Sequence, residues 1–133
     1  KSGGREKKKK KYERRQEMKL ICYKKCTTCK GVEKMLEEKS IKYDYRDIKE
    51  DNPSAAEIKK WHKKSSLDIK RFFNTSGQIY RNEGLKDKLP NMSEEEKYDL
   101  LATDGMLVKR PILITDDEEI YVGPDVKKYI ETL

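Results

Sequence analysis

The chain has 133 residues, of which 43% are charged and 34% hydrophobic, and its formal net charge is +7. This length suits one domain, and because no apolar run approaches about 18 residues and no signal-peptide pattern is present, we expect a cytoplasmic protein without a membrane span. Three cysteines in such a chain exclude a disulfide framework and favour catalytic or incidental thiols.

The excess positive charge belongs to the first 17 residues. Residues 1–17 carry nine Lys or Arg and three Glu, whereas the remaining 116 residues hold 23 basic and 22 acidic side chains. We therefore expect residues 1–17 to be a disordered basic leader or an artificial extension, and residues 18–133 to form the domain. A basic character confined to a tail does not predict direct nucleic-acid binding by that domain.

Residues 26–29 form a CxxC motif between an apolar run, residues 20–23, and a helical pattern, residues 30–39. A cysteine at a helix N-terminus meets unpaired N–H groups and the positive end of the helix dipole, which can lower its pKa from about 8.5 to between about 3.5 and about 7.5. Lys25 adds positive charge there. We therefore predict that Cys26 is the nucleophile and that Cys29, one turn further on, resolves a mixed disulfide.

Zinc is the competing use of a CxxC motif. A structural zinc site needs four ligands, and outside the pair the chain offers only Cys22 and His62, at none of the usual spacings. Cys22 lies in the first apolar run, where a cysteine most often packs as a small apolar side chain. His62 is expected to be an ordinary helix residue, exposed or half-buried, and we predict no metal site.

The first half of the chain alternates strand and helix patterns. Residues 19–23 form a short β-type run, and residues 28–39 place Val32, Met35 and Leu36 on one helical face. Residues 41–48 alternate apolar and polar side chains, as a strand does. Strand, helix and strand make a βαβ unit, so the two strands should be parallel with a right-handed crossover.

The middle of the chain, residues 54–102, is expected to be a helical insert. Ser54 and Glu57 have the spacing of a capping box for a helix reaching Lys64. A second short helix is predicted at residues 67–73, followed by helical fragments at residues 78–89 that end at Pro90. A further helix begins after Ser93 with three acidic residues in its first turn.

The C-terminal part returns to strands. Residues 111–115 and 119–123 are separated by a turn so short that they must form an antiparallel hairpin. Pro124, at a first helical position, opens a closing helix. The predicted fold is therefore α/β, with a mixed four-stranded sheet flanked by helices in a thioredoxin-like arrangement.

Four features of the chain resemble the ArsC/Spx family. They are the CxxC after the first strand, the run RFFNTSG at residues 71–77, the run GMLVKRPILI at residues 105–114, and the terminal hairpin and helix. The resemblance covers nearly all of residues 18–133, and by pattern it is closest to the arsenate-reductase-like, YusI/YffB-like branch. It implies a thioredoxin-like fold and chemistry at the first cysteine of the motif.

The resemblance also implies roles for particular residues. In the arsenate reductases of this family the nucleophile matches Cys26, and one of three arsenate-binding arginines matches Arg110. The other two positions fall on Asn74 and near Gly123, which argues against arsenate reduction. The family proline that matches Pro111 forms a cis peptide facing the active cysteine, and a proline makes the cis form inexpensive.

We therefore predict a thiol-disulfide oxidoreductase. Cys26, Cys29 and Arg110 are the expected catalytic residues, and the expected substrate-binding residues are Lys25, Thr27, Thr28, Asn74 and Pro111. The substrate would be a disulfide-containing protein or a glutathione mixed disulfide, and glutathione or a thioredoxin- or glutaredoxin-type protein would act as reductant. No tightly bound cofactor is expected, since the chain has no phosphate-binding glycine motif.

Two alternatives remain open. The CxxC also resembles the Spx branch, whose members use the pair as a redox-sensing switch and bind the α subunit of RNA polymerase. The runs that follow Phe73 and Gly84 favour the enzyme-like branch instead. The other alternative is a structural member of the family whose CxxC has no redox role.

Overall fold

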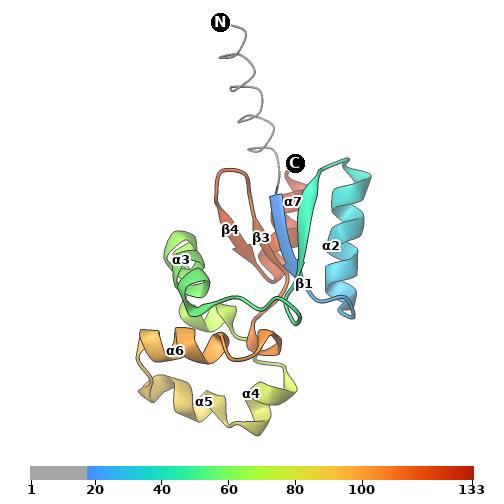
Figure 1. The fold of residues 1–133 in the computed structure, drawn as a ribbon. Coiled ribbons are helices and arrows are strands. Elements are labelled where there is room, and N and C mark those ends of the chain that lie inside the picture. Colours follow the sequence, from blue (N-terminus) through green and yellow to red (C-terminus); the bar gives the residue numbers. More distant parts are fainter. Residues whose placement is uncertain (1–17) are drawn as a thin grey trace, which may run out of the picture.

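Residues 18–133 are described by the computed structural model, in which a mixed four-stranded sheet carries helices on both faces (Figure 1). The predictions made for residues 1–17 lie outside the described residues. Within residues 18–133, no helix is both long enough and apolar enough to cross a membrane.

The predicted order of elements is confirmed. The strands are β1 (Met18–Cys22), β2 (Tyr43–Asp47), β3 (Ile112–Ile114) and β4 (Ile120–Val122). The α-helices are α2 (Thr27–Glu38), α3 (Ala55–Ser65), α4 (Gln78–Asn82), α5 (Leu85–Lys88), α6 (Glu94–Leu101) and α7 (Pro124–Glu131), with short 3-10 helices η1 (Ile69–Phe72), η2 (Leu89–Asn91) and η3 (Gly105–Leu107).

The sheet has the strand order β2-β1-β3-β4. β1 pairs parallel with β2, as the βαβ prediction required, and antiparallel with β3. β3 and β4 form the predicted antiparallel hairpin. β1 is therefore a central strand, and the loop that carries the CxxC motif leaves from its C-terminal end.

The alternation of side chains along β1 divides the core in two. Leu20 and Cys22 point to the face covered by α2 and α7, where they share a buried cluster with Val32 and Leu36. Ile21 points to the other face, where α3 and the segment between β2 and β3 supply the larger cluster, which includes Trp61 and Phe72. Figure 1 shows α2 and α7 on one side of the sheet and α3 on the other.

The helical segment between β2 and β3 differs from the prediction in detail. The capping box of α3 is confirmed, with Ser54 and Glu57 bonded reciprocally. The helix predicted at residues 67–73 is only the 3-10 turn η1, because Phe73 turns to extended backbone and pairs with Val108. Pro90 does not end the helical fragments, since it lies inside η2 at a first-turn position.

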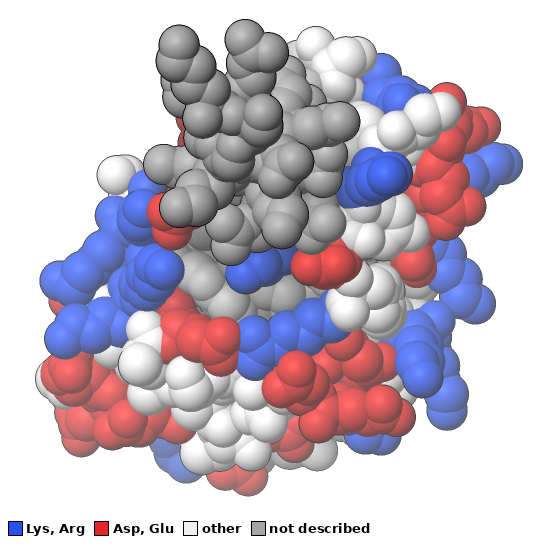
Figure 2. All heavy atoms as spheres, turned by 45° about the horizontal axis from the view of Figure 1, so that its top comes forward, with Lys and Arg blue, Asp and Glu red and all other residues white. Residues whose placement is uncertain are grey.

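Basic and acidic side chains lie intermixed over the face seen in Figure 2. This distribution agrees with the near balance of charge in residues 18–133. The described side chains visible in this view form no single basic stripe of the kind that a phosphate backbone would need.

Candidate active site

Cys26 occupies the position predicted for the nucleophile. It is the N-cap residue of α2, with φ −89° and ψ 121°. Its backbone N–H donates to the Tyr23 carbonyl at 3.0 Å, which closes the loop from β1 to α2, and its own carbonyl accepts the Lys30 N–H at 3.1 Å. As the N-cap residue, Cys26 lies at the helix N-terminus and is half-buried, and its side chain makes no capping hydrogen bond.

Cys29 lies within the first turn of α2, with its side chain fully buried. It packs in the cluster beneath α2 and α7, together with Leu20 and Val32. Only Cys26 of the pair is therefore partly open to a substrate disulfide, and Cys29 can act only on a bond already formed at Cys26. The difference in burial supports the division into nucleophile and resolving thiol.

The pKa of Cys29 is lowered to about 7. The largest cause is a hydrogen bond from the Cys22 side chain; burial opposes the shift, and hydrogen bonds with the Tyr23 backbone and the Cys26 side chain, together with the charge of Arg110, support it. The hydrogen bond to Cys29 and burial raise the pKa of Cys22, so that Cys22 keeps its proton. All three cysteines are free thiols, and they lie in one group, because Cys22 and Cys29 are buried in the same cluster and Cys26 packs against it.

Arg110 lies beside this group from the loop before β3. The Arg110–Pro111 peptide is cis, as the resemblance implied. The guanidinium carbon is 5.3 Å from the centroid of the Tyr23 ring, a cation–π distance. Within residues 18–133 its Nε and Nη1 atoms are buried and have no hydrogen-bond partner, so the site holds a positive charge with two unused donors.

The other predicted substrate-binding residues lie in two places. Lys25, Thr27 and Thr28 are exposed around the start of α2, next to Cys26. Asn74 is half-buried, and its side-chain amide donates to the Met106 carbonyl at 3.3 Å. That contact belongs to a short ladder in which residues 72–74 meet residues 107–109, which lead directly to Arg110.

Two relationships were missed by sequence reasoning. Tyr23 was considered only as part of the strand, although it provides the aromatic face for Arg110. Cys22 was predicted to be a small core residue, and it is fully buried, but it also shares its buried cluster with Cys29. The available signal was the strand period, because Cys22 follows Leu20 by two and shares its face.

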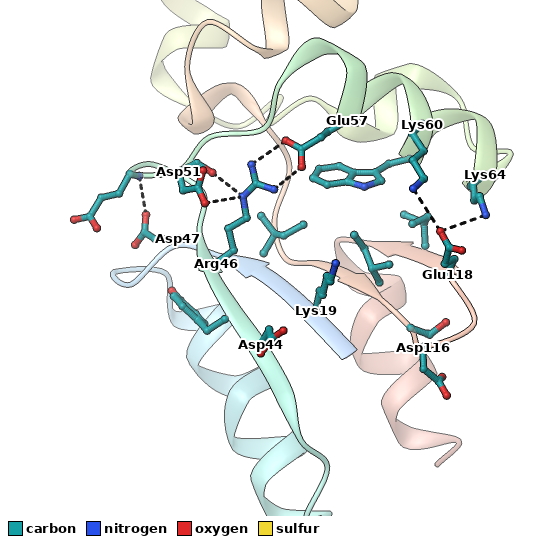
Figure 3. A pocket seen from close by; sticks show the side chains of 17 residues that line it. Lys19, Asp44, Arg46, Asp47, Asp51, Glu57, Lys60, Lys64, Asp116 and Glu118 are labelled. Carbon is teal, nitrogen blue, oxygen red and sulfur yellow. Dashed lines mark hydrogen bonds and ion pairs between the residues drawn. The ribbon is translucent and has the colours of Figure 1, made fainter. Parts of the chain in front are cut away.

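A cavity of about 680 Å³ lies on the opposite face of the sheet, against α3 (Figure 3). Its walls carry ion pairs, with Arg46 and Glu57 at 2.7 Å and with Glu118 at 3.5 Å from Lys60. None of the three cysteines lines it. In residues 18–133 no cluster of three or more His, Cys, Asp or Glu side chains could hold a metal ion.

Comparison with known proteins agrees with this geometry. The family model described as "ArsC family" matches residues 22–132. The chain belongs to the ArsC family. It is 52% identical to the protein YusI of Bacillus subtilis over 101 residues, which are 76% of this chain and 85% of YusI. Its fold matches the crystal structure of an ArsC family related protein from Bacteroides fragilis with a TM-score of 0.78 and 43% identity, covering 85% of this chain and 96% of the other.

The chain is also similar, at lower identity, to the global transcriptional regulator Spx of Staphylococcus epidermidis. It is 26% identical over 98 residues, which are 74% of this chain and 72% of Spx. The fold of this ArsC family chain is thus thioredoxin-like, and its relatives support a thiol-based redox role.

Proposed function

We propose that this protein is a thiol-disulfide oxidoreductase in which Cys26 is the nucleophile and Cys29 the resolving thiol. The observation that carries the proposal is the pairing of a half-buried cysteine at the N-cap of α2 with a fully buried cysteine whose pKa is lowered to about 7. Such a pair separates the attack on an external disulfide from the internal step that releases the product.

The cycle has three steps. The Cys26 thiolate attacks one sulfur of a substrate disulfide, forms a mixed disulfide and releases the other sulfur as a thiolate, which takes a proton from water. The Cys29 thiolate then attacks the Cys26 sulfur, forms the Cys26–Cys29 disulfide and releases the second substrate thiolate. Two glutathione molecules, or one dithiol protein of the thioredoxin or glutaredoxin type, return two electrons and restore the thiols.

Arg110 has two roles in this cycle. Its charge lowers the pKa of Cys29 and so favours the thiolate needed for the second step. Its Nε and Nη1 donors are buried without a hydrogen-bond partner, so a substrate carboxylate or backbone carbonyl that reached them on binding could accept hydrogen bonds from both. Lys25, Thr27 and Thr28 are exposed around the start of α2, where they would contact a substrate bound at Cys26.

The test is stopped-flow reaction of the reduced protein with a chromogenic aromatic disulfide. The unmodified chain should release two coloured thiolates per molecule in two phases, the first from Cys26 and the second from Cys29. Cys29→Ser should release one and retain a mixed disulfide that mass spectrometry locates at Cys26. A fast phase of unchanged size in Cys26→Ser, which keeps Cys29, would overturn the assignment.

A redox-sensing regulator is the second candidate, favoured by the similarity to Spx. In that case the CxxC would act as a switch, and oxidation would change binding to the α subunit of RNA polymerase. Pull-down with the purified α subunit, using the reduced and the oxidised chain, separates the two. Oxidation-dependent binding together with negligible turnover of glutathione disulfide would favour the regulator.

A further inference from the structure

Arg110 carries a positive charge that no acidic side chain among residues 18–133 neutralises through an ion pair. Its Nε and Nη1 atoms are buried without a hydrogen-bond partner, although the residue as a whole is only half-buried. An arginine side chain stays charged in proteins, so this charge is permanent. The site therefore attracts an incoming anion, and the position of the guanidinium decides where that attraction acts.

Tyr23 connects this charge to the proposed nucleophile. The guanidinium carbon of Arg110 lies 5.3 Å from the centroid of the Tyr23 ring. The Tyr23 carbonyl accepts the Cys26 N–H at 3.0 Å, in the loop directly after β1. One half-buried residue thus contacts the cation through its side chain and the nucleophilic cysteine through its backbone.

An aromatic ring can hold an arginine without cancelling its charge. The face of the ring attracts the cation, whereas the N–H groups at the edge of the guanidinium stay available to other acceptors. A carboxylate in the same place would occupy those donors and neutralise the charge. Tyr23 is therefore the kind of neighbour that fixes Arg110 and leaves it able to bind an anionic group.

The backbone on both sides of the arginine is fixed by other contacts. Lys109, which precedes it, donates its N–H to the Phe72 carbonyl at 2.8 Å. Pro111, which follows it, accepts the Gly123 N–H at 2.8 Å. Because these bonds do not involve Tyr23, a change of its ring should alter the position of the guanidinium and leave the path of the chain intact.

We propose that Tyr23 is a positioning residue that makes the site selective for disulfides with a negative charge, by holding the Arg110 guanidinium where a substrate carboxylate close to the reacting sulfurs meets it. This inference rests on the proposed disulfide chemistry of Cys26. Neither Tyr23 nor Arg110 forms or breaks a covalent bond, since Cys26 attacks one sulfur and the other leaves as a thiolate. A neutral disulfide gains nothing from Arg110 and should not respond to Tyr23 in this way.

The experiment measures the first phase of the reaction with two aromatic disulfides. Dithiobis(nitrobenzoate) carries a carboxylate on each ring, whereas dithiodipyridine is neutral. The rate constant for the charged disulfide, divided by that for the neutral one, cancels any common change in the reactivity of Cys26. Tyr23→Leu should lower this ratio about fivefold. Tyr23→Phe, which keeps the aromatic face and loses only the hydroxyl, should leave it within about twofold.

An Arg110→Met background shows whether Tyr23 acts through Arg110. Arg110→Met alone should lower the ratio at least as much as Tyr23→Leu does, and adding Tyr23→Leu should then cause no further loss. An equal loss from Tyr23→Leu with and without Arg110 would overturn the proposal, as would an unchanged ratio or the same loss in Tyr23→Phe. Tyr23→Met takes the place of Tyr23→Leu if that variant does not fold.

The proposed function has a separate readout. Mass spectrometry of Cys29→Ser, after reaction with the neutral disulfide, shows whether the mixed disulfide forms at Cys26. If it does and only the ratio fails to respond to Tyr23→Leu, the inference is wrong and the proposed function stands. If neither disulfide reacts at Cys26, the proposed function is wrong and the inference fails with it.

Discussion

Arg110 and Tyr23 face each other across the cysteine loop, with the guanidinium 5.3 Å from the ring centroid. Within residues 18–133, two of the guanidinium nitrogens are buried without a partner. A buried unsatisfied donor usually costs about 1–3 kcal/mol of stability, so a protein that keeps one at a site of chemistry sacrifices stability there. The positive charge beside Cys29 gives a functional reason for keeping this arginine.

Replacing Arg110 should therefore separate stability from chemistry. Arg110→Met removes the unpaired donors but keeps an unbranched apolar chain against Tyr23, so the free energy of unfolding of the reduced protein should rise by about 1 kcal/mol. Loss of the charge should raise the pKa of Cys29 and move the pH profile of the resolving phase upward. Urea unfolding and the stopped-flow profile measure the two effects.

Arg110→Lys is the matched control, because it keeps the charge and loses the planar group of donors. It should leave the pH profile closer to that of the unmodified chain than Arg110→Met does. A large loss of stability in Arg110→Met would show that the two nitrogens have partners in solution.

The ion pair between Arg46 and Glu57 should make the free energy of unfolding depend on pH, independently of the cysteines. The hydrogen bonds from Arg46 lower the pKa of Glu57 from its ordinary value of 4.5 to about 2 (Figure 3). A depressed folded-state pKa contributes stability above the unfolded value, and that stability is lost as the pH falls through the folded value. Because the Glu57 side chain is 39% exposed, solvent screening reduces the effect to about 1 kcal/mol.

Glu57→Gln should accordingly lower the free energy of unfolding at pH 7 and have a vanishing effect as the pH falls from about 4.5 towards about 2. Urea unfolding at three pH values in this window is the measurement. Glu95→Gln, which changes an exposed partner of Lys59, is the control for a general effect of charge. If Glu57→Gln lowered the free energy of unfolding by the same amount at every pH, the effect would come from the capping box and not from the charge of Glu57.

Among the glycines of residues 18–133, Gly105 has the least room for a side chain. A Cβ at this position would collide with the Ile48 carbonyl, which is backbone and cannot move aside as a flexible side chain can. Gly105→Ala should lower the free energy of unfolding by about 2 kcal/mol or more. Gly84→Ala is the control. An added Cβ at Gly84 meets no neighbouring atom, so only the positive φ of +61° is unfavourable, and the free energy of unfolding should fall by about 1 kcal/mol. Thermal unfolding that ranks Gly84→Ala as the more damaging change would contradict this assignment.

Local patterns in the sequence were sufficient for most of the fold. The spacing of Val32 and Leu36 predicted α2, and the short turn before β4 dictated the hairpin, because each depends on neighbours along the chain. The 3-10 turn at Ile69–Phe72 was not predictable in this way. Its end is set by the pairing of Phe73 with Val108, 35 positions later.

The candidate site, like the fold, was predictable from the sequence only in part. The N-cap position of Cys26 followed from a strand and a helix adjoining the motif, and Arg110 from a family resemblance. The contact of Tyr23 with Arg110 and the burial of Cys22 and Cys29 in one cluster depend on how β1, α2 and the loop before β3 pack together. Propensity and spacing carry no information about such long-range contacts, although the strand period did place Cys22 on the face that α2 covers.

Cys26 occupies an N-cap at which serine is the better residue for stability. Its side chain makes no capping hydrogen bond, whereas a serine oxygen at an N-cap accepts an N–H of the first helical turn. Cys26→Ser should therefore abolish the first phase of the disulfide reaction while raising the free energy of unfolding of the reduced protein by about 0.5–1 kcal/mol. Cys26→Ala, which can neither cap nor react, should lack both the activity and the stabilisation. A Cys26→Ser variant no more stable than Cys26→Ala under reducing conditions would show that the hydroxyl does not reach the helix, whereas the expected ranking would mean that the chain gives up helix stability to hold a reactive sulfur at this position.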